Sequence, residues 1–373
     1  MWLLFVFSVL TVLDGGAAKT ASSLDPATYS PSRTVIVLSQ NTQVFAADKP
    51  IGVIPPGSVL HFSKVHEKWL MVPRFGGWVF ADDVVPLENA VKHFTSIMDK
   101  QPSASAFLHR GIAHLQLDEL DEAKADFEEA IRRGTKDGAA YINLGNVLQQ
   151  RGLTQEALAN YSKGIELSPD LALSYIERSS ILMEMKQFPE AAADLEKAIA
   201  LEPTSPEAYN NRGVLHQLQG RYEDSIKDFT KTIELFSKDS SAYANRGFVL
   251  QQLGRYAEAL ADFETALVID PNSDEIANDA AWLLATCPDA KIRNPARAIE
   301  LANRACAATN RENGSHLDTL AAALAAAQKY DEAVKVGEEA LERLKTNNQA
   351  VEVHARVELY RQKKPFVETP EKK

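Results

Sequence analysis

The sequence has few of the residues that mark a disulfide framework or a nucleic-acid surface. It contains only two cysteines, Cys287 and Cys306, in 373 residues. Two are too few for a disulfide framework, so we expect both to be small buried residues. Acidic residues outnumber basic ones by 51 to 40, and no basic run is longer than a pair. Because phosphate-binding surfaces need clustered Lys and Arg, the sequence argues against a nucleic-acid partner.

Motifs of catalysis and metal binding are also missing. The eight histidines show no paired metal-ligand spacing, and the sequence has no phosphate-binding glycine loop and no nucleophile elbow. It therefore predicts a protein without enzymatic activity, metal or cofactor. An unrecognised hydrolase is the alternative, because catalytic groups can converge from distant positions.

The N-terminus carries an apolar run. The first thirteen residues, MWLLFVFSVLTVL, are almost entirely apolar, and small residues follow from Gly16 to Ala18. A membrane-spanning helix needs about 20 residues, so the run is typical of a secretory signal peptide over residues 1–18, followed by a linker over 19–32. This predicts an exported chain, periplasmic or extracellular, with no membrane span when mature. A short buried helix is the alternative, since no Lys or Arg precedes the run.

Most of the remaining sequence is a repeat with a spacing of 34 residues. In five segments a small residue follows an aromatic one by four positions, and a second small residue and a bulky one come further on. The first small column is Gly111, Gly145, Ser179, Gly213 and Gly247, and the bulky column is Phe127, Tyr161, Leu195, Phe229 and Phe263. Small residues let two antiparallel helices approach closely, so each segment is predicted to be a helical hairpin.

These columns resemble the tetratricopeptide repeat. Turn glycines Gly152, Gly220 and Gly254 lie between the expected helices, and two degraded units continue through Ala277–Ala305 and Leu317–Ala340. The resemblance implies a mostly α fold, a right-handed superhelical solenoid of about seven hairpins over residues 104–347. We expect capping helices at 88–103 and at the start of 348–373, where a charged tail follows. An ordinary linker helix is the alternative for 88–103.

Strand periodicity replaces the repeat over residues 33–87. The expected strands are Thr34–Leu38, Thr42–Ala46, Ser58–Val65, Lys68–Val72 and Gly77–Phe80. The stretches Trp69-Leu-Met-Val72 and Gly77-Trp78-Val79 resemble bacterial Src-homology-3-like domains, which implies a small all-β barrel. The resemblance further implies that Trp69 and Trp78 form an aromatic shelf for a ligand such as peptidoglycan. Alternatively, both are core or structural residues of a barrel too small to spare them.

The resemblance to the tetratricopeptide repeat places a binding groove on the first helices of the hairpins, which line the concave side of such a solenoid. Positions near the glycine column are rich in amides, which suit a peptide backbone. The predicted partner-binding groove contains Asn143, Asn146, Gln149, Asn210, Asn211, Gln217, Asn245, Phe248 and Gln251. Whether the chain's own tail, residues 363–373, occupies the groove is left open.

Four arginines directly precede the small column: Arg110, Arg178, Arg212 and Arg246. We expect them to pair with acidic residues of second helices, such as Asp126, Asp228 and Asp262, rather than with a ligand.

The leading hypothesis is a non-enzymatic protein-interaction scaffold that holds a peptide or partner segment in the groove. The alternative is a cell-wall-associated adaptor whose β-barrel binds peptidoglycan or a cell-surface ligand.

Overall fold

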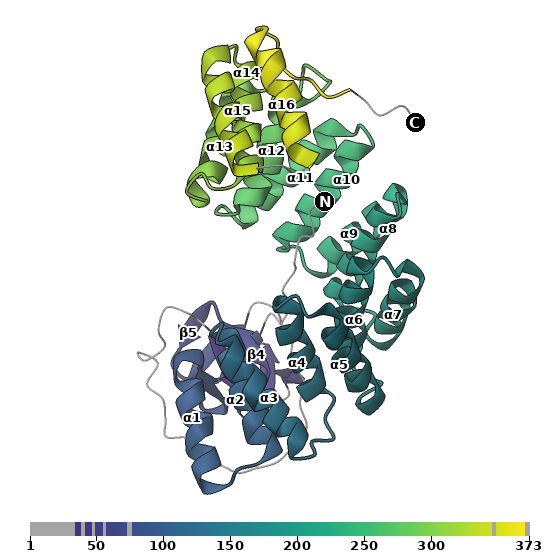
Figure 1. Ribbon diagram of the computed structural model, residues 1–373. Helices are drawn as coiled ribbons and strands as arrows, with labels where there is room; N and C mark the ends of the chain where they lie inside the picture. Colours follow the sequence, from purple (N-terminus) through teal and green to yellow (C-terminus); the bar gives the residue numbers. More distant parts are fainter. Residues whose placement is uncertain are drawn as a thin grey trace. The chain divides into compact units, whose positions relative to one another are not determined.

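The computed structural model describes residues 34–38, 42–46, 49–54, 57–72, 77–344 and 348–369. The chain forms two compact units, residues 1–211 and 212–373, and both are drawn in Figure 1. The predicted signal peptide and linker lie outside the described residues, so export stays a prediction. Within the described ranges, no helix has the length and apolar character needed to cross a membrane.

The first unit begins with short antiparallel strands in two sheets. Their orders are β4-β1-β8 and β3-β2-β7-β6-β5. The strands are β1 (Thr34–Val37), β2 (Thr42–Ala46), β3 (Lys49–Ile54), β4 (Val59–His61), β5 (Lys64–His66), β6 (Trp69–Val72), β7 (Gly77–Phe80) and β8 (Val84–Pro86). The Src-homology-3-like identity of this region stays a prediction.

The expected strand pattern is wrong in two respects. The run Ser58–Val65 is divided between β4 and β5, and strands β3 and β8 were not expected. Strand β3 lies at a sheet edge and is exposed along most of its length, so it lacks the alternation that identifies a half-buried strand. Strand β8 is buried throughout and ends in proline, which gives no alternating signal either.

Helix α1 (Leu87–Lys100) packs against both the strands and the first hairpin. Ile36 of β1 and Val85 of β8 belong to the same buried core as Phe94 of α1 and Ile112 of the next helix. The strands have a second core of their own around Val44, which excludes these residues. In the first unit, α1 therefore joins the strand region to the helices.

Seven helical hairpins follow α1, as predicted. They are α2 (Ala104–Gln116) with α3 (Leu120–Arg132), α4 (Ala139–Gln150) with α5 (Thr154–Leu167), α6 (Ala172–Glu184) with α7 (Phe188–Leu201), α8 (Pro206–Leu218) with α9 (Tyr222–Leu235), α10 (Ser240–Gln252) with α11 (Tyr256–Ile269), α12 (Asp274–Thr286) with α13 (Pro295–Ala308), and α14 (Gly314–Ala326) with α15 (Tyr330–Leu344). Helix α16 (Asn348–Arg361) covers the last of them.

The glycine column permits the close crossing inside a hairpin. A Cβ atom on Gly213 would lie 2.7 Å from Cε1 of Phe229, a distance that real Cβ contacts do not reach. The third hairpin has Ser179 and the non-aromatic Leu195 at these two offsets. A larger residue on the first helix therefore accompanies a smaller one on the second.

The predicted arginine pairs are confirmed. Arg110 donates two hydrogen bonds to Asp126, of 2.8 and 2.7 Å. The same bidentate geometry joins Arg178 to Asp194, Arg212 to Asp228, and Arg246 to Asp262. Bidentate arginine–carboxylate contacts fix orientation as well as adding energy, so these pairs hold the two helices of a hairpin in register.

Three of these arginines also reach the preceding helical layer. In each case the third guanidinium nitrogen donates to a hydroxyl oxygen. The distances are 3.2 Å from Arg110 to Thr95, 3.3 Å from Arg178 to Ser162 and 3.0 Å from Arg246 to Thr230. Each of these arginines therefore links successive layers of its own unit. Its guanidinium nitrogens donate to protein side chains, as expected for a structural role rather than for ligand binding.

The two cysteines are buried and unpaired, as predicted. Cys287 caps the end of α12, and Cys306 lies within α13. Burial raises the pKa of the Cys306 thiol to about 11, so the thiol stays protonated and unreactive near neutral pH.

Candidate functional site

The nine predicted groove residues all lie on first helices, in α4, α8 and α10, but they differ in exposure. Asn143, Asn210 and Asn245 are buried, with 2 to 4% of their surface exposed, so the expectation of exposed amides is wrong for these three. Asn143 shows one reason, because its side chain turns back and donates to the Ala139 carbonyl at 2.9 Å. Phe248 is exposed, and the remaining five are half-buried. Their role in binding stays a prediction.

In the first unit, amides connect neighbouring first helices. Gln149 of α4 donates to Glu184 of α6 at 3.0 Å, and Asn211 of α8 donates to Ser180 of α6 at 3.2 Å. The Tyr161 hydroxyl lies 2.6 Å from Oδ1 of Asn146 and 2.9 Å from Oε1 of Gln149. This surface is therefore a network of hydrogen-bonding side chains that are fixed by one another.

Sequence reasoning missed three ionisable residues at an equivalent position. His109, Glu177 and Asp279 stand two residues before the glycine column or its continuation, at the offset that Asn143, Asn211 and Asn245 also occupy. The pKa of Glu177 is raised to about 8, mainly by burial and to a smaller extent by the negative charge of the neighbouring Glu207. Burial also raises the pKa of Asp279 to about 7 and lowers that of His109 to about 4.

Near neutral pH these shifts favour the uncharged forms of His109 and Glu177, whereas Asp279 is close to half-ionised. The groove residues were chosen by residue type, as amides, and this choice excluded the three ionisable residues at the same offset. The 34-residue spacing alone would have identified these ionisable residues as equivalent to the asparagines.

In the second unit the chain's own tail lies on the first helices. Lys363 has a left-handed backbone (φ 57°) and Pro365 follows, so α16 ends and residues 364–369 continue without helical structure. The Glu368 N–H donates to the Thr286 carbonyl at 2.8 Å. Its carboxylate accepts from Trp282 Nε1 at 2.6 Å and from Gln251 Nε2 at 3.4 Å. A predicted groove residue, Gln251, therefore contacts the tail.

An aromatic contact completes the tail site. The Phe366 ring lies 5.9 Å from that of Trp282. The Arg356 guanidinium is 5.2 Å from the Trp282 ring and 5.4 Å from the Phe366 ring, within range of a cation–π contact. Asp318 holds this guanidinium through bonds of 3.1 and 2.6 Å.

The two tryptophans of the strand region lie on a sheet face and not in the core. Along β6 and β7 half-buried residues alternate with buried ones, so Trp69, Trp78 and Phe80 share the face opposite the core. Phe45 and Phe80 contact the Trp69 ring edge-on, at 5.4 and 5.2 Å. Both tryptophans therefore lie outside the buried core of the strands, and the aromatic shelf stays a prediction.

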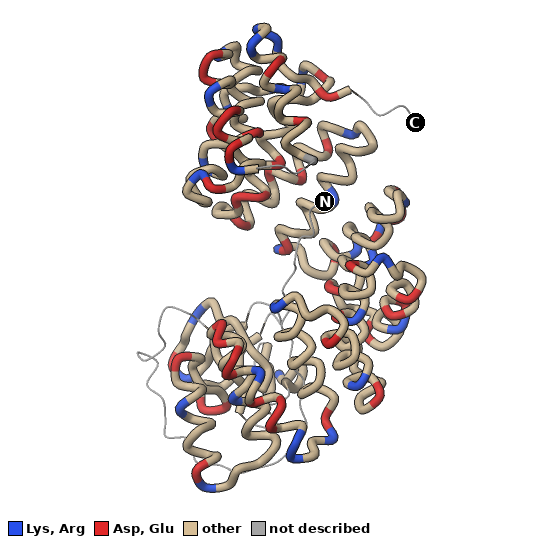
Figure 2. The backbone as a smooth tube through the Cα atoms, viewed as in Figure 1, with Lys and Arg blue, Asp and Glu red and all other residues tan. Residues whose placement is uncertain are grey.

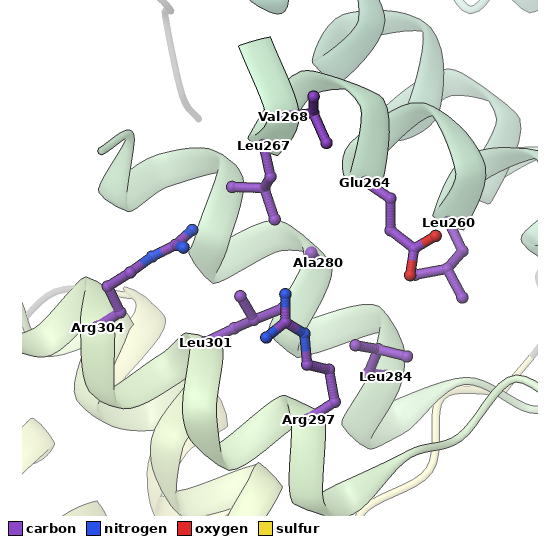
Figure 3. Close-up of a pocket in the computed structure, with 9 residues that line it drawn as sticks. All are labelled: Leu260, Glu264, Leu267, Val268, Ala280, Leu284, Arg297, Leu301 and Arg304. Atoms are coloured by element: carbon purple, nitrogen blue, oxygen red, sulfur yellow. The ribbon is translucent and has the colours of Figure 1, made fainter. Parts of the chain in front are cut away.

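The second unit also has a pocket away from the tail. A pocket of about 320 Å³ between α11, α12 and α13 is lined by Leu260, Glu264, Leu267, Val268, Ala280, Leu284, Arg297, Leu301 and Arg304, and Figure 3 shows these side chains. None of the predicted groove residues lines it.

In Figure 2 acidic and basic residues are interspersed along both units. Among the residues that the structure describes, no cluster of three His, Cys, Asp or Glu side chains could hold a metal ion.

Family models identify the repeats. Models of the tetratricopeptide repeat match residues 88–172, 206–239, 240–273 and 313–347, and a TPR repeat model matches 180–220. Together these matches cover more than half of the chain. The chain is a tetratricopeptide repeat protein. Proteins of this family are generally non-enzymatic scaffolds for protein interaction.

Solved structures with the same fold are distant in sequence. The Cut9–Hcn1 hetero-tetramer of APC/C matches 64% of this chain and 46% of that chain, with 20% identity and a TM-score of 0.58. Pseudomonas aeruginosa PilF matches 58% of this chain and 96% of its own, with 24% identity and a TM-score of 0.50. The match to yeast Tom70 covers 74% of this chain and 59% of the Tom70 chain, with 18% identity and a TM-score of 0.50. A comparison with curated proteins finds no match. At these identities the likeness establishes the fold alone.

Proposed function

We propose that this tetratricopeptide repeat protein is a non-enzymatic adaptor that binds a segment of a partner protein on the first helices of its hairpins. The observation that carries the proposal is the tail, since Glu368 makes backbone and side-chain contacts with α10 and α12, and Phe366 contacts the Trp282 ring of α12. A surface that binds one non-helical segment has the donors and acceptors to bind another. Export, which the sequence predicts, belongs to the proposal and is tested by N-terminal sequencing of the mature chain.

Site-specific photocrosslinking tests where a partner binds. A photoreactive phenylalanine at Phe248, an exposed position on first helix α10, should crosslink to a second protein in cells that express the chain. The matched control is Val268 on second helix α11, which is 80% exposed. Equal crosslinking at the two positions, or crosslinking at Val268 alone, would contradict the proposal.

The aromatic face of the strand region favours a second, separate contact. Trp69, Trp78 and Phe80 are half-buried on one face of the sheet. Peptidoglycan stays the predicted ligand class for this face. Cosedimentation with purified peptidoglycan should retain the wild type and lose Trp78→Ala, while Val53→Ala, an exposed change on β3, should be retained. Retention of Trp78→Ala at the wild-type level would rule out this contact.

A further inference from the structure

The tail has the alternation of an extended strand. Phe366 and Glu368 are half-buried against the second unit, whereas Val367 between them is 36% exposed. Successive side chains of an extended segment point to opposite sides. The tail therefore presents two side chains, two residues apart, to the surface beneath it.

Glu368 is held at three points. Its backbone N–H donates to the Thr286 carbonyl, and its two carboxylate oxygens accept from Trp282 and Gln251. The indole N–H is only a donor, so it requires an acceptor in the ligand. Hydrogen bonds to a charged acceptor are stronger than neutral ones. The carboxylate is therefore the group that this part of the site recognises best.

The aromatic half of the site is fixed within the second unit. Arg356 and Asp318 are both buried, with 9% and 6% of their surface exposed, and they form a bidentate ion pair. The ion pair fixes the guanidinium against the Trp282 ring independently of the tail. A site whose side chains are already fixed loses less entropy when its ligand binds. Phe366 completes it by placing a third planar group beside the other two.

We propose that Gln251, Trp282, Thr286 and Arg356 form a recognition site for a protein segment in which an aromatic residue is followed two positions later by a carboxylate. The chain's own tail is the intramolecular occupant, and a partner segment with the same pattern displaces it. The proposal rests on the proposed function, because it names the ligand class for the same surface. A short connection from the end of α16 at Arg361 to Phe366 gives the tail an effective concentration on the order of millimolar, which favours self-occupation.

Peptide binding to an opened chain tests the proposal. The full-length double variant Phe366→Ala, Glu368→Gln removes the aromatic ring and the carboxylate charge of the tail, and circular dichroism verifies that it is folded. A fluorescent peptide with the sequence of residues 362–373 should bind this variant at least about tenfold more tightly than it binds the wild type, because the wild-type tail competes at high effective concentration. The control variant Val367→Ala, changed at the exposed position, should bind like the wild type.

Changes in the peptide and in the site locate the contacts. With the opened chain, a peptide carrying Phe366→Ala or Glu368→Gln should lose about tenfold in affinity or more, and one carrying Val367→Ala should change by less than about twofold. Adding Trp282→Phe to the opened chain keeps an aromatic ring but removes the N–H donor. It should weaken the unmodified peptide more than the Glu368→Gln peptide, because the amide oxygen of Gln is an uncharged and weaker acceptor for the same N–H.

Any of three peptide-binding results would overturn the proposal: no binding to a folded opened chain, equal affinity for the wild type and the opened chain, or a loss for the Val367→Ala peptide equal to that for the Phe366→Ala or Glu368→Gln peptide. A wild-type dimer in light scattering that the opened chain lacks would show that the tail fills a second copy's site, which also contradicts self-occupation. Failure of the adaptor role is distinguishable, since peptide binding would then persist without crosslinking at Phe248. Failure of the tail site alone would leave that crosslinking intact.

Discussion

Glu177 is a residue whose burial costs stability. Its folded-state pKa of about 8 lies above the ordinary 4.5. Between these pH values the unfolded chain has released a proton that the folded chain retains, so the free energy of unfolding falls as pH rises through this window. Glu177 therefore makes the stability of the first unit depend on pH.

Glu177→Gln should remove this dependence. We expect the variant to melt about 2–4 °C above the wild type at pH 8 and close to it at pH 4, measured by thermal unfolding. The matched control is Glu166→Gln, a change at an exposed carboxylate on α5. A difference between Glu177→Gln and wild type that is the same at both pH values would contradict the assignment.

Gly213 and Phe229 are predicted to be energetically coupled. Because a Cβ atom on Gly213 would meet the Phe229 ring, Gly213→Ser should lower the free energy of unfolding by about 1–3 kcal/mol. Adding Phe229→Leu reproduces the pair found at Ser179 and Leu195, and should cost at least about 0.5 kcal/mol less than the two single changes added together. Denaturant unfolding measures the coupling. Gly213→Ser combined with Phe263→Leu, from the next hairpin, should be additive.

Within an element, the turn between the helices of a hairpin requires a left-handed residue. Gly152, Gly220 and Gly254 have φ of 72°, 72° and 75°, and the same offset in other hairpins holds Asp118 at 61° and Lys186 at 58°. This conformation costs a residue with a Cβ atom roughly 1–2 kcal/mol. The seventh hairpin has Gln328 at this offset, with φ of 62°. Three turns are therefore less favourable than the three that have glycine.

Lys186→Gly should stabilise the chain by about 0.5–1 kcal/mol, because relief of the strain exceeds the added entropy of the unfolded state. Denaturant unfolding provides the measurement. The control is Gln187→Gly at the next position, where φ is −86°, and it should give no gain. Equal effects of the two changes would mean that the turn is not strained.

The hairpins were predictable because each column in the sequence has one structural task. Glycine faces an aromatic ring, arginine faces an aspartate, and a turn glycine takes a positive φ. The strands were less predictable. Strand β3 is exposed and β8 is buried along its whole length, so neither shows the period of two that identifies a half-buried strand.

At the scale of the whole molecule, the sequence predicted only part of the surface that the tail contacts. Gln251 was among the predicted groove residues, whereas Trp282 and Arg356 were not, and the position of the tail was left open. These groups lie on α12, on α16 and beyond it, and no repeat spacing connects α16 to the glycine column. Only the folded second unit brings Glu368 to Gln251, which lies 117 positions earlier in the sequence.

The most direct test of the central claim follows the resonance of Trp282 in a chain labelled with 5-fluorotryptophan, assigned with Trp282→Phe. If the first helices bind non-helical protein segments, the resonance should move when Phe366→Ala and Glu368→Gln release the tail, and should return towards its wild-type position when the peptide of residues 362–373 is added. A Trp282 resonance that is the same in the wild type, the opened chain and the opened chain saturated with peptide would contradict the account.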